Sequence, residues 1–253
     1  MNLLEARAKI ERANVHIGDV ERRVNALEQT DTAIVEIHPE HGTERLTHTL
    51  DESGFDQIAL VTGDAVHNLN CALDYTWLQT IQKLAPNNVN DRAKFPVHKT
   101  INELKGELRK GNVDTTCPHL FTFIVDEIQP CDIQPCDGGN PAIWPIHCFA
   151  NRDKHRFLIP VLAEGHINGI EVQDETGKRS PGSGFTAPQK PPYCFDIRMG
   201  LHFTKKGKLT ANVIVEDEKS GCRMDIPQTL VMYSGAIAGV VEAFESFLMS
   251  EGF

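Results

Sequence analysis

The chain has 253 residues, of which 40% are hydrophobic, which is enough for one large domain or two small ones with a sizeable core. Its formal net charge of −10 counts against nucleic acid as a general partner, because phosphate binding relies on Lys and Arg. Uninterrupted apolar runs stay below the roughly 18 residues of a membrane span. The 7 cysteines, without a signal peptide, favour reduced thiols. We therefore expect a soluble, cytoplasmic protein that does not enter a membrane.

The first half of the chain is expected to be helical with one inserted β-hairpin. Apolar residues recur every three or four positions over several segments, which predicts helices at about residues 2–28, 55–84, 101–110 and 118–129. The third of these helices begins with the capping-box spacing of Thr100 and Glu103. Thr32–Ile37 and Thr43–Leu50 flank the turn-like 39–42, which predicts the hairpin.

A loop is expected between residues 130 and 145, where prolines and glycines are frequent. It overlaps a direct repeat in which Ile128–Asp132 is followed at once by Ile133–Asp137. Cys131 and Cys136 could suggest a zinc site, but the sequence has no second cysteine pair at a suitable spacing. A small tandem duplication in a surface loop is therefore the favoured interpretation.

The last third of the chain is expected to be β-rich and to end in a helix. Apolar and polar residues alternate strictly over 195–203, which predicts one strand with a buried face. Neighbouring strands are expected at 157–162, 167–172, 209–215 and 222–226. The Pro- and Gly-rich segment 175–192 is expected to be an irregular loop or lid.

These elements predict an α+β fold in which a helical bundle-like group with an inserted β-hairpin is followed by an antiparallel sheet and a C-terminal helix. We expect one domain over 1–253. Its helical part covers about 1–156, its β-rich part about 157–227 and its closing helix about 228–250.

The long helix carries a stripe of polar residues. At about 100° per residue, His67, Asn70, Cys71 and Asp74 gather on one side, whereas Asn68 lies on a separate polar edge. An imidazole, an amide and a carboxylate could therefore point into one shared space. The alternative is a solvated polar face.

A second polar group follows the loop. In a helix starting at residue 144, His147, Asn151, Lys154 and, at the margin, His155 share a side, while Arg152 and Arg156 point elsewhere. A lysine and histidines among apolar neighbours are costly to bury unless they are paired, so we expect Asp74 as their partner if the two helices pack together. A purely structural salt bridge is the alternative.

Two short blocks resemble a group of uncharacterised bacterial proteins. Their pattern is Gly-Asp, two residues, His-Asn-Leu-Arg-Ser-Ala-Leu-Asp-His, and later Asn, one or two residues, Asp-Lys-His-Arg. The matching blocks here are Gly63–Asp74 (GDAVHNLNCALD) and Asn151–Arg156 (NRDKHR). The positions that agree are His67, Asn68, Asp74, Asn151, Asp153, Lys154, His155 and Arg156.

Part of that pattern is similar to the signature of HEPN ribonucleases, in which an Arg and a His on one helix cleave RNA without metal at a dimer interface. The resemblance implies RNA or a nucleotide as partner, and a homodimer. This chain has Asn70 in place of the Arg and Tyr75 in place of the His. Because asparagine carries no charge and tyrosine is a poor base near neutral pH, cleavage through these two positions is doubtful.

The leading hypothesis is an HEPN-like protein associated with nucleic acid or nucleotides, in bacterial defence or toxin biology. Lys154, His155 and Arg156 would bind phosphate. The candidate catalytic residues are His67, Asp74, Lys154 and His155, and the candidate binding residues are Asn68, Asn70, His147, Asn151, Asp153 and Arg156.

Two alternatives remain open at this stage. One is a small-molecule or metal-dependent hydrolase that uses His67, Asp74, His147 and His155. Seven residues of helix, roughly 10 Å at 1.5 Å per residue, separate the first two, which favours hydrogen bonding over shared metal ligation. The other is a non-catalytic interaction protein. The sequence specifies neither a metal nor another cofactor.

Overall fold

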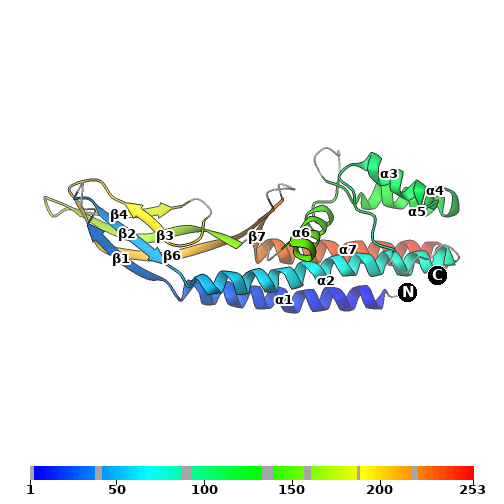
Figure 1. Ribbon diagram of the computed structural model, residues 1–253, viewed down its shortest axis with the longest axis horizontal. Helices are drawn as coiled ribbons and strands as arrows, with labels where there is room; N and C mark the ends of the chain where they lie inside the picture. Colours follow the sequence, from blue (N-terminus) through cyan, green and yellow to red (C-terminus); the bar gives the residue numbers. More distant parts are fainter. Residues whose placement is uncertain are drawn as a thin grey trace.

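The computed structural model is α+β, with 53% of the chain in helices and 27% in strands, as predicted. It describes residues 3–37, 42–86, 93–132, 139–156, 161–186, 189–217 and 222–253; the side chains of 153–156, 217 and 222 lie outside this description. Figure 1 shows an elongated molecule in which long helices form one end and the β-sheets form the other.

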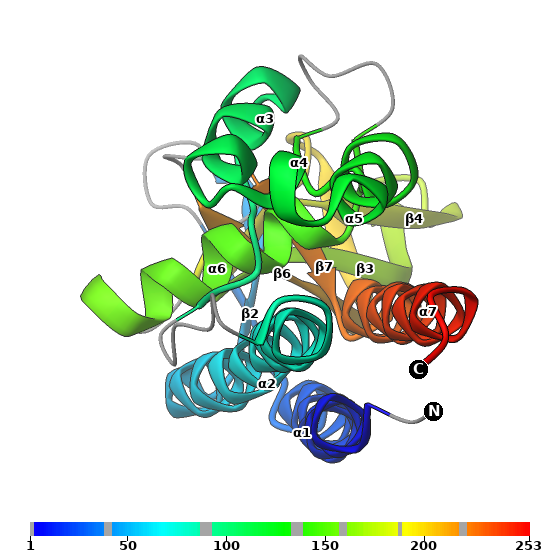
Figure 2. The ribbon, with the colours of Figure 1, turned by 90° about the vertical axis from the view of Figure 1, so that its right-hand side faces the viewer.

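Three long helices run beside one another: α1 (Leu4–Glu28), α2 (Glu52–Leu84) and α7 (Gln228–Ser250). Figure 2 looks along this bundle and shows α2 between α1 and the smaller helices of the chain. The inward residues of α1 follow the helical period and are buried; they are Ala6, Ile10, Ala13, Ile17, Val20, Val24 and Leu27. The apolar residues that repeat with the helical period therefore form the face of α1 that packs against the neighbouring helices.

An ion pair fixes the start of α1 on α7. Glu245 is 6% exposed and accepts hydrogen bonds from Leu3 N at 2.8 Å and from Arg7 Nη2 at 2.5 Å. The hydrogen bond from Arg7 lowers the pKa of the Glu245 carboxyl below its usual value. A buried carboxylate is stable here because its oxygens have donors.

The β end consists of two antiparallel sheets. One sheet has the order β1-β2-β5 and consists of β1 (Thr32–Ile37), β2 (Glu44–Thr49) and β5 (Tyr193–Asp196). The other has the order β4-β3-β6-β7 and consists of β4 (Arg179–Phe185), β3 (Val161–Asp174), β6 (Leu201–Asp217) and β7 (Cys222–Ile226). The hairpin between the first two long helices thus gains a third strand from a distant part of the chain.

A group of short helices covers the other end of α2: α3 (Ile101–Lys110), α4 (Val113–Thr116), α5 (Pro118–Thr122) and the π-helix η2 (Phe123–Ile128). The helix α6 (Ile143–Arg156) packs against α2 and α7. Figure 2 shows α6 crossing α2 on the side away from α1.

The predicted helices and the hairpin are confirmed to within a few residues. The capping box is present, since Glu103 N donates to Thr100 Oγ1 and Thr100 N donates to the Glu103 carboxylate. The loop predicted to reach residue 145 ends earlier, because α6 already begins at Ile143. Pro145 fits there because the first turn of a helix has no intrahelical partner for its N–H groups.

The single strand predicted over 195–203 is wrong. β5 ends at Asp196 and β6 begins at Leu201, in a different sheet. Gly200 lies between them with φ +81°, in the left-handed region that ends an extended segment. The alternation of apolar and polar residues continues through this turn, so the sequence pattern alone does not show where one strand ends and the next begins.

The irregular lid predicted over 175–192 is also wrong in part, because β4 lies inside it and pairs with β3. Pro181 is tolerated there because β4 is an edge strand, where a missing N–H breaks no sheet bond. The strands predicted at 157–162 and 167–172 are one continuous strand from Val161, with 157–160 outside the described residues.

α7 is long and apolar enough to cross a membrane by length and composition. In the structure it packs along α1 and α2 and buries Leu230, Ser234, Ile237, Val240, Val241, Phe244, Glu245 and Leu248. The core helix of a soluble protein has the same composition, and the fold is compatible with a soluble protein.

Candidate functional site

The polar stripe predicted on the long helix lies on α2, the helix against which α6 packs. Cys71 Sγ lies 3.5 Å from His67 Nε2, and Asn70 Nδ2 donates to Asp74 Oδ2 at 3.3 Å. Asn70 is 7% exposed, and the other three side chains are half-buried. The stripe is therefore not a solvated surface.

Asp74 holds a separate piece of chain against α2. Its Oδ1 accepts a hydrogen bond of 2.9 Å from the backbone N–H of Phe95. The Phe95 ring packs edge-on against Trp77, with centroids 6.3 Å apart, and against Phe244 at 5.8 Å. Asp74 consequently positions an aromatic side chain of the core.

Asn68 does not join this stripe. Its Nδ2 donates to Asp64 O at 2.8 Å, and its Oδ1 accepts from Lys9 Nζ of α1 at 3.4 Å. Although 8% exposed, it faces a different helix. Its described contacts are those of a residue that joins α1 to α2.

The second polar group lies on α6, where Asn140 caps the helix by accepting from Ala142 N at 3.0 Å. One turn apart on this helix, Asn151 Nδ2 lies 2.8 Å from His147 Nε2. The Trp144 ring stacks on the His147 ring, with centroids 6.3 Å apart and an interplanar angle of 24°. These contacts hold the imidazole in one orientation and make Nε2 the acceptor of the Asn151 amide.

The remaining predicted site residues lie in the last turns of α6. Asp153, Lys154, His155 and Arg156 are helical in backbone, and their side chains lie outside the described residues. Arg152 is half-buried. The two helices that carry the predicted site residues pack against each other.

The two positions that correspond to the HEPN catalytic pair do not form a pair here. Asn70 is enclosed and donates to Asp74, while the Tyr75 side chain is exposed at 38%. Five residues of helix turn the two side chains about 140° apart. This geometry, like the chemistry of asparagine and tyrosine, argues against RNA cleavage by these two residues acting together.

Among the described residues, no group of three or more His, Cys, Asp or Glu side chains is arranged to hold a metal ion. Cys131 of the repeat is buried and forms no disulfide, and Cys136 lies outside the described residues. Disulfides are likewise absent at the described Cys71, Cys117, Cys148 and Cys194.

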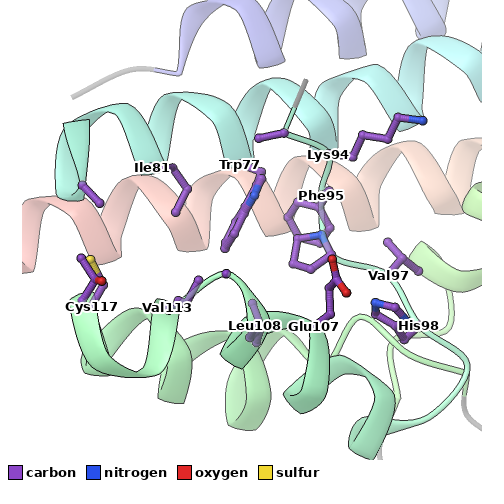
Figure 3. Close-up of a pocket in the computed structure, with 15 residues that line it drawn as sticks. Trp77, Ile81, Lys94, Phe95, Val97, His98, Glu107, Leu108, Val113 and Cys117 are labelled. Atoms are coloured by element: carbon purple, nitrogen blue, oxygen red, sulfur yellow. The ribbon is translucent and has the colours of Figure 1, made fainter. Parts of the chain in front are cut away.

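Sequence reasoning missed a cavity of about 530 Å³ beside the end of α2 (Figure 3). It is half open to solvent and lies between α2, the segment 93–98, α3 and α4, and its lining residues include Trp77, Phe95 and Leu108. Cys117 lies at one end, where burial raises the pKa of its thiol. The only sequence signal was Trp77, one turn after Asp74, because the other walls come from separate elements.

Comparison with known proteins gave no match to any protein-family model and no similar curated protein or solved structure.

Proposed function

We propose that the chain is an HEPN-like protein associated with nucleotides or nucleic acid, in bacterial defence or toxin biology, with its ligand site at the joint of α2 and α6. The observation that carries this proposal is the packing of α6 against α2, because each of these helices contains one of the two motif blocks. Helices that pack together can bring residues from distant parts of the sequence into one site.

The proposed site binds phosphate and does not cleave RNA through the HEPN positions. Lys154, His155 and Arg156 supply positive charge, and Asn151 with His147 supplies oriented hydrogen-bonding groups. Cleavage by an Arg and His pair is not part of the proposal, because Asn70 and Tyr75 occupy those positions.

The test is binding of a short labelled single-stranded RNA and of ATP at low salt, measured by fluorescence anisotropy and calorimetry. Lys154→Ala is expected to weaken binding about tenfold and to lower the salt dependence by about one ion. Arg22→Ala is the matched control, since its side chain is 76% exposed on α1 and pairs with Asp19 at 3.1 Å. If neither RNA nor ATP binds the wild-type protein, the proposal fails.

A non-catalytic interaction protein is the second candidate, and the contacts of Asp74 favour it. Both carboxylate oxygens accept hydrogen bonds within the fold, from Phe95 N and from Asn70. A carboxylate used in this way stabilises packing. The hydrolase that uses His67, Asp74, His147 and His155 is the third candidate, and stoichiometric metal in elemental analysis, lost in His67→Ala, would favour it.

We further propose that the protein is cytoplasmic. We also propose that it forms a homodimer, which the HEPN resemblance implies. Light scattering coupled to gel filtration tests the oligomeric state. A monomer at all concentrations would contradict the homodimer.

A further inference from the structure

The cavity beside the end of α2 has the dimensions of a ligand site. Its volume of about 530 Å³ falls within the roughly 300–1,000 Å³ of small-molecule pockets. The pocket is half open to solvent, so a small molecule can enter it without unfolding of the surrounding segments.

The lining of the cavity is mixed, with aromatic and aliphatic side chains beside the polar side chains of Lys94, His98 and Glu107. Trp77, Phe95 and Leu108 line it, and each is at most 7% exposed, so their positions are set by the core behind them. The rings of Trp77 and Phe95 pack edge to face against each other at 73°. An apolar body of about the size of a phenyl group would bury its surface against these walls.

The side chains of Glu107 and Lys94, both of which line the cavity, point in different directions. Figure 3 shows the Glu107 carboxylate pointing from α3 toward Phe95, with the His98 ring beside it, while the Lys94 side chain extends away. Glu107 is 53% exposed and makes an ion pair with the exposed Lys110 at 3.9 Å. Such a long surface pair is weak, so a ligand cation can replace Lys110.

We propose that this cavity binds a small organic amine, with an aryl or alkyl body between Trp77, Phe95 and Leu108 and its ammonium group on the Glu107 carboxylate. The indole of Trp77 adds a favourable aromatic face for a cation. The net charge of −10 attracts cations to the protein and disfavours a carboxylate ligand.

This inference goes beyond the proposed function and uses none of the phosphate-binding residues. The two sites share one structural link, since Asp74 of the polar stripe accepts the N–H of Phe95 in the cavity wall. Variants of Glu107 and Lys154 therefore test the two proposals separately.

The experiment compares three probes of similar shape and different charge: 2-phenylethylamine, 3-phenylpropionate and 2-phenylethanol. Calorimetry on the full chain is expected to show the amine binding at least about tenfold more tightly than the carboxylate. Glu107→Gln is expected to weaken the amine about tenfold and to leave the alcohol unchanged. Equal binding of the three probes, or an amine affinity that Glu107→Gln does not change, overturns the proposal.

Asp114→Asn is the matched control, because it removes the same charge from the same group of helices. Its carboxylate lies 3.8 Å from Arg109 Nε and does not line the cavity, so amine binding is expected to stay unchanged. Val113→Phe enlarges a side chain that lines the cavity and is expected to abolish binding of the amine and the alcohol; because Val113 is buried, folding of this variant is checked by thermal melting.

A second readout in the wild-type protein does not depend on the folding of any variant. Bound amine is expected to slow alkylation of Cys117, which lines the cavity, and to leave the exposed Cys194 of the β end unaffected. Alkylation followed by mass spectrometry measures both thiols in one sample. Absence of both protection and calorimetric binding at millimolar amine rules out the site.

Discussion

Two regions meet on α2, one turn apart: the polar groups of α2 and α6, here called the polar joint, which include Asp74, and the cavity, which Trp77 lines. They differ in how their side chains are satisfied. In the joint, described side chains satisfy one another, as Asn70 does with Asp74 and His147 with Asn151. In the cavity, Trp77 is one of the residues that line a half-open pocket. Polar groups can pair within a fold, so a polar cluster does not by itself locate a ligand, whereas a pocket with aromatic walls offers surface on which a ligand can be buried.

The largest expected loss of stability comes from removing an aromatic ring, either Phe244 in the core or Trp77 at the cavity. Phe244 is fully buried between Phe95 and Phe123, and Phe244→Ala is expected to cost about 3 to 5 kcal/mol of unfolding free energy. Trp77→Ala is expected to cost less, about 2 to 3 kcal/mol, because the indole already borders a cavity. Urea denaturation measures both. An equal loss for the two variants would mean that the space beside Trp77 is as well packed as the core.

A smaller effect is expected at the link between the two regions. Asp74→Ala leaves the Phe95 N–H and the Asn70 amide without their acceptor, which is expected to cost about 2 to 3 kcal/mol. Asp64→Ala, at an exposed position of the same helix, is expected to stay within about 0.5 kcal/mol. Similar losses for the two variants would remove the positioning role assigned to Asp74.

The smallest effect is expected inside the polar stripe itself. Cys71→Ala removes the contact of 3.5 Å with His67 Nε2, and a thiol is a weak hydrogen-bonding group. The expected loss is below about 1 kcal/mol, measured by thermal melting with Cys148→Ala, a half-buried thiol on α6, for comparison. A loss of several kcal/mol would show that the stripe depends on this pair.

The sequence predicted the local elements well where a local signal exists. The helical period of Ala6 to Leu27 and the capping box at Thr100 depend only on neighbours a few residues apart. It misplaced β4 and the strand over 195–203, because strand pairing depends on partners far along the chain. Period-two alternation does not say which sheet a strand joins.

For the candidate sites, the sequence by itself determined which side of α2 carries His67, Asn70, Cys71 and Asp74, since the helical period alone sets that arrangement. Only the tertiary structure decided what surrounds those groups, by placing α6 against α2 and the N–H of Phe95 against Asp74. The cavity is wholly a tertiary property. Its walls come from α2, the segment 93–98, α3 and α4, and no spacing along one element can encode the volume that remains between four.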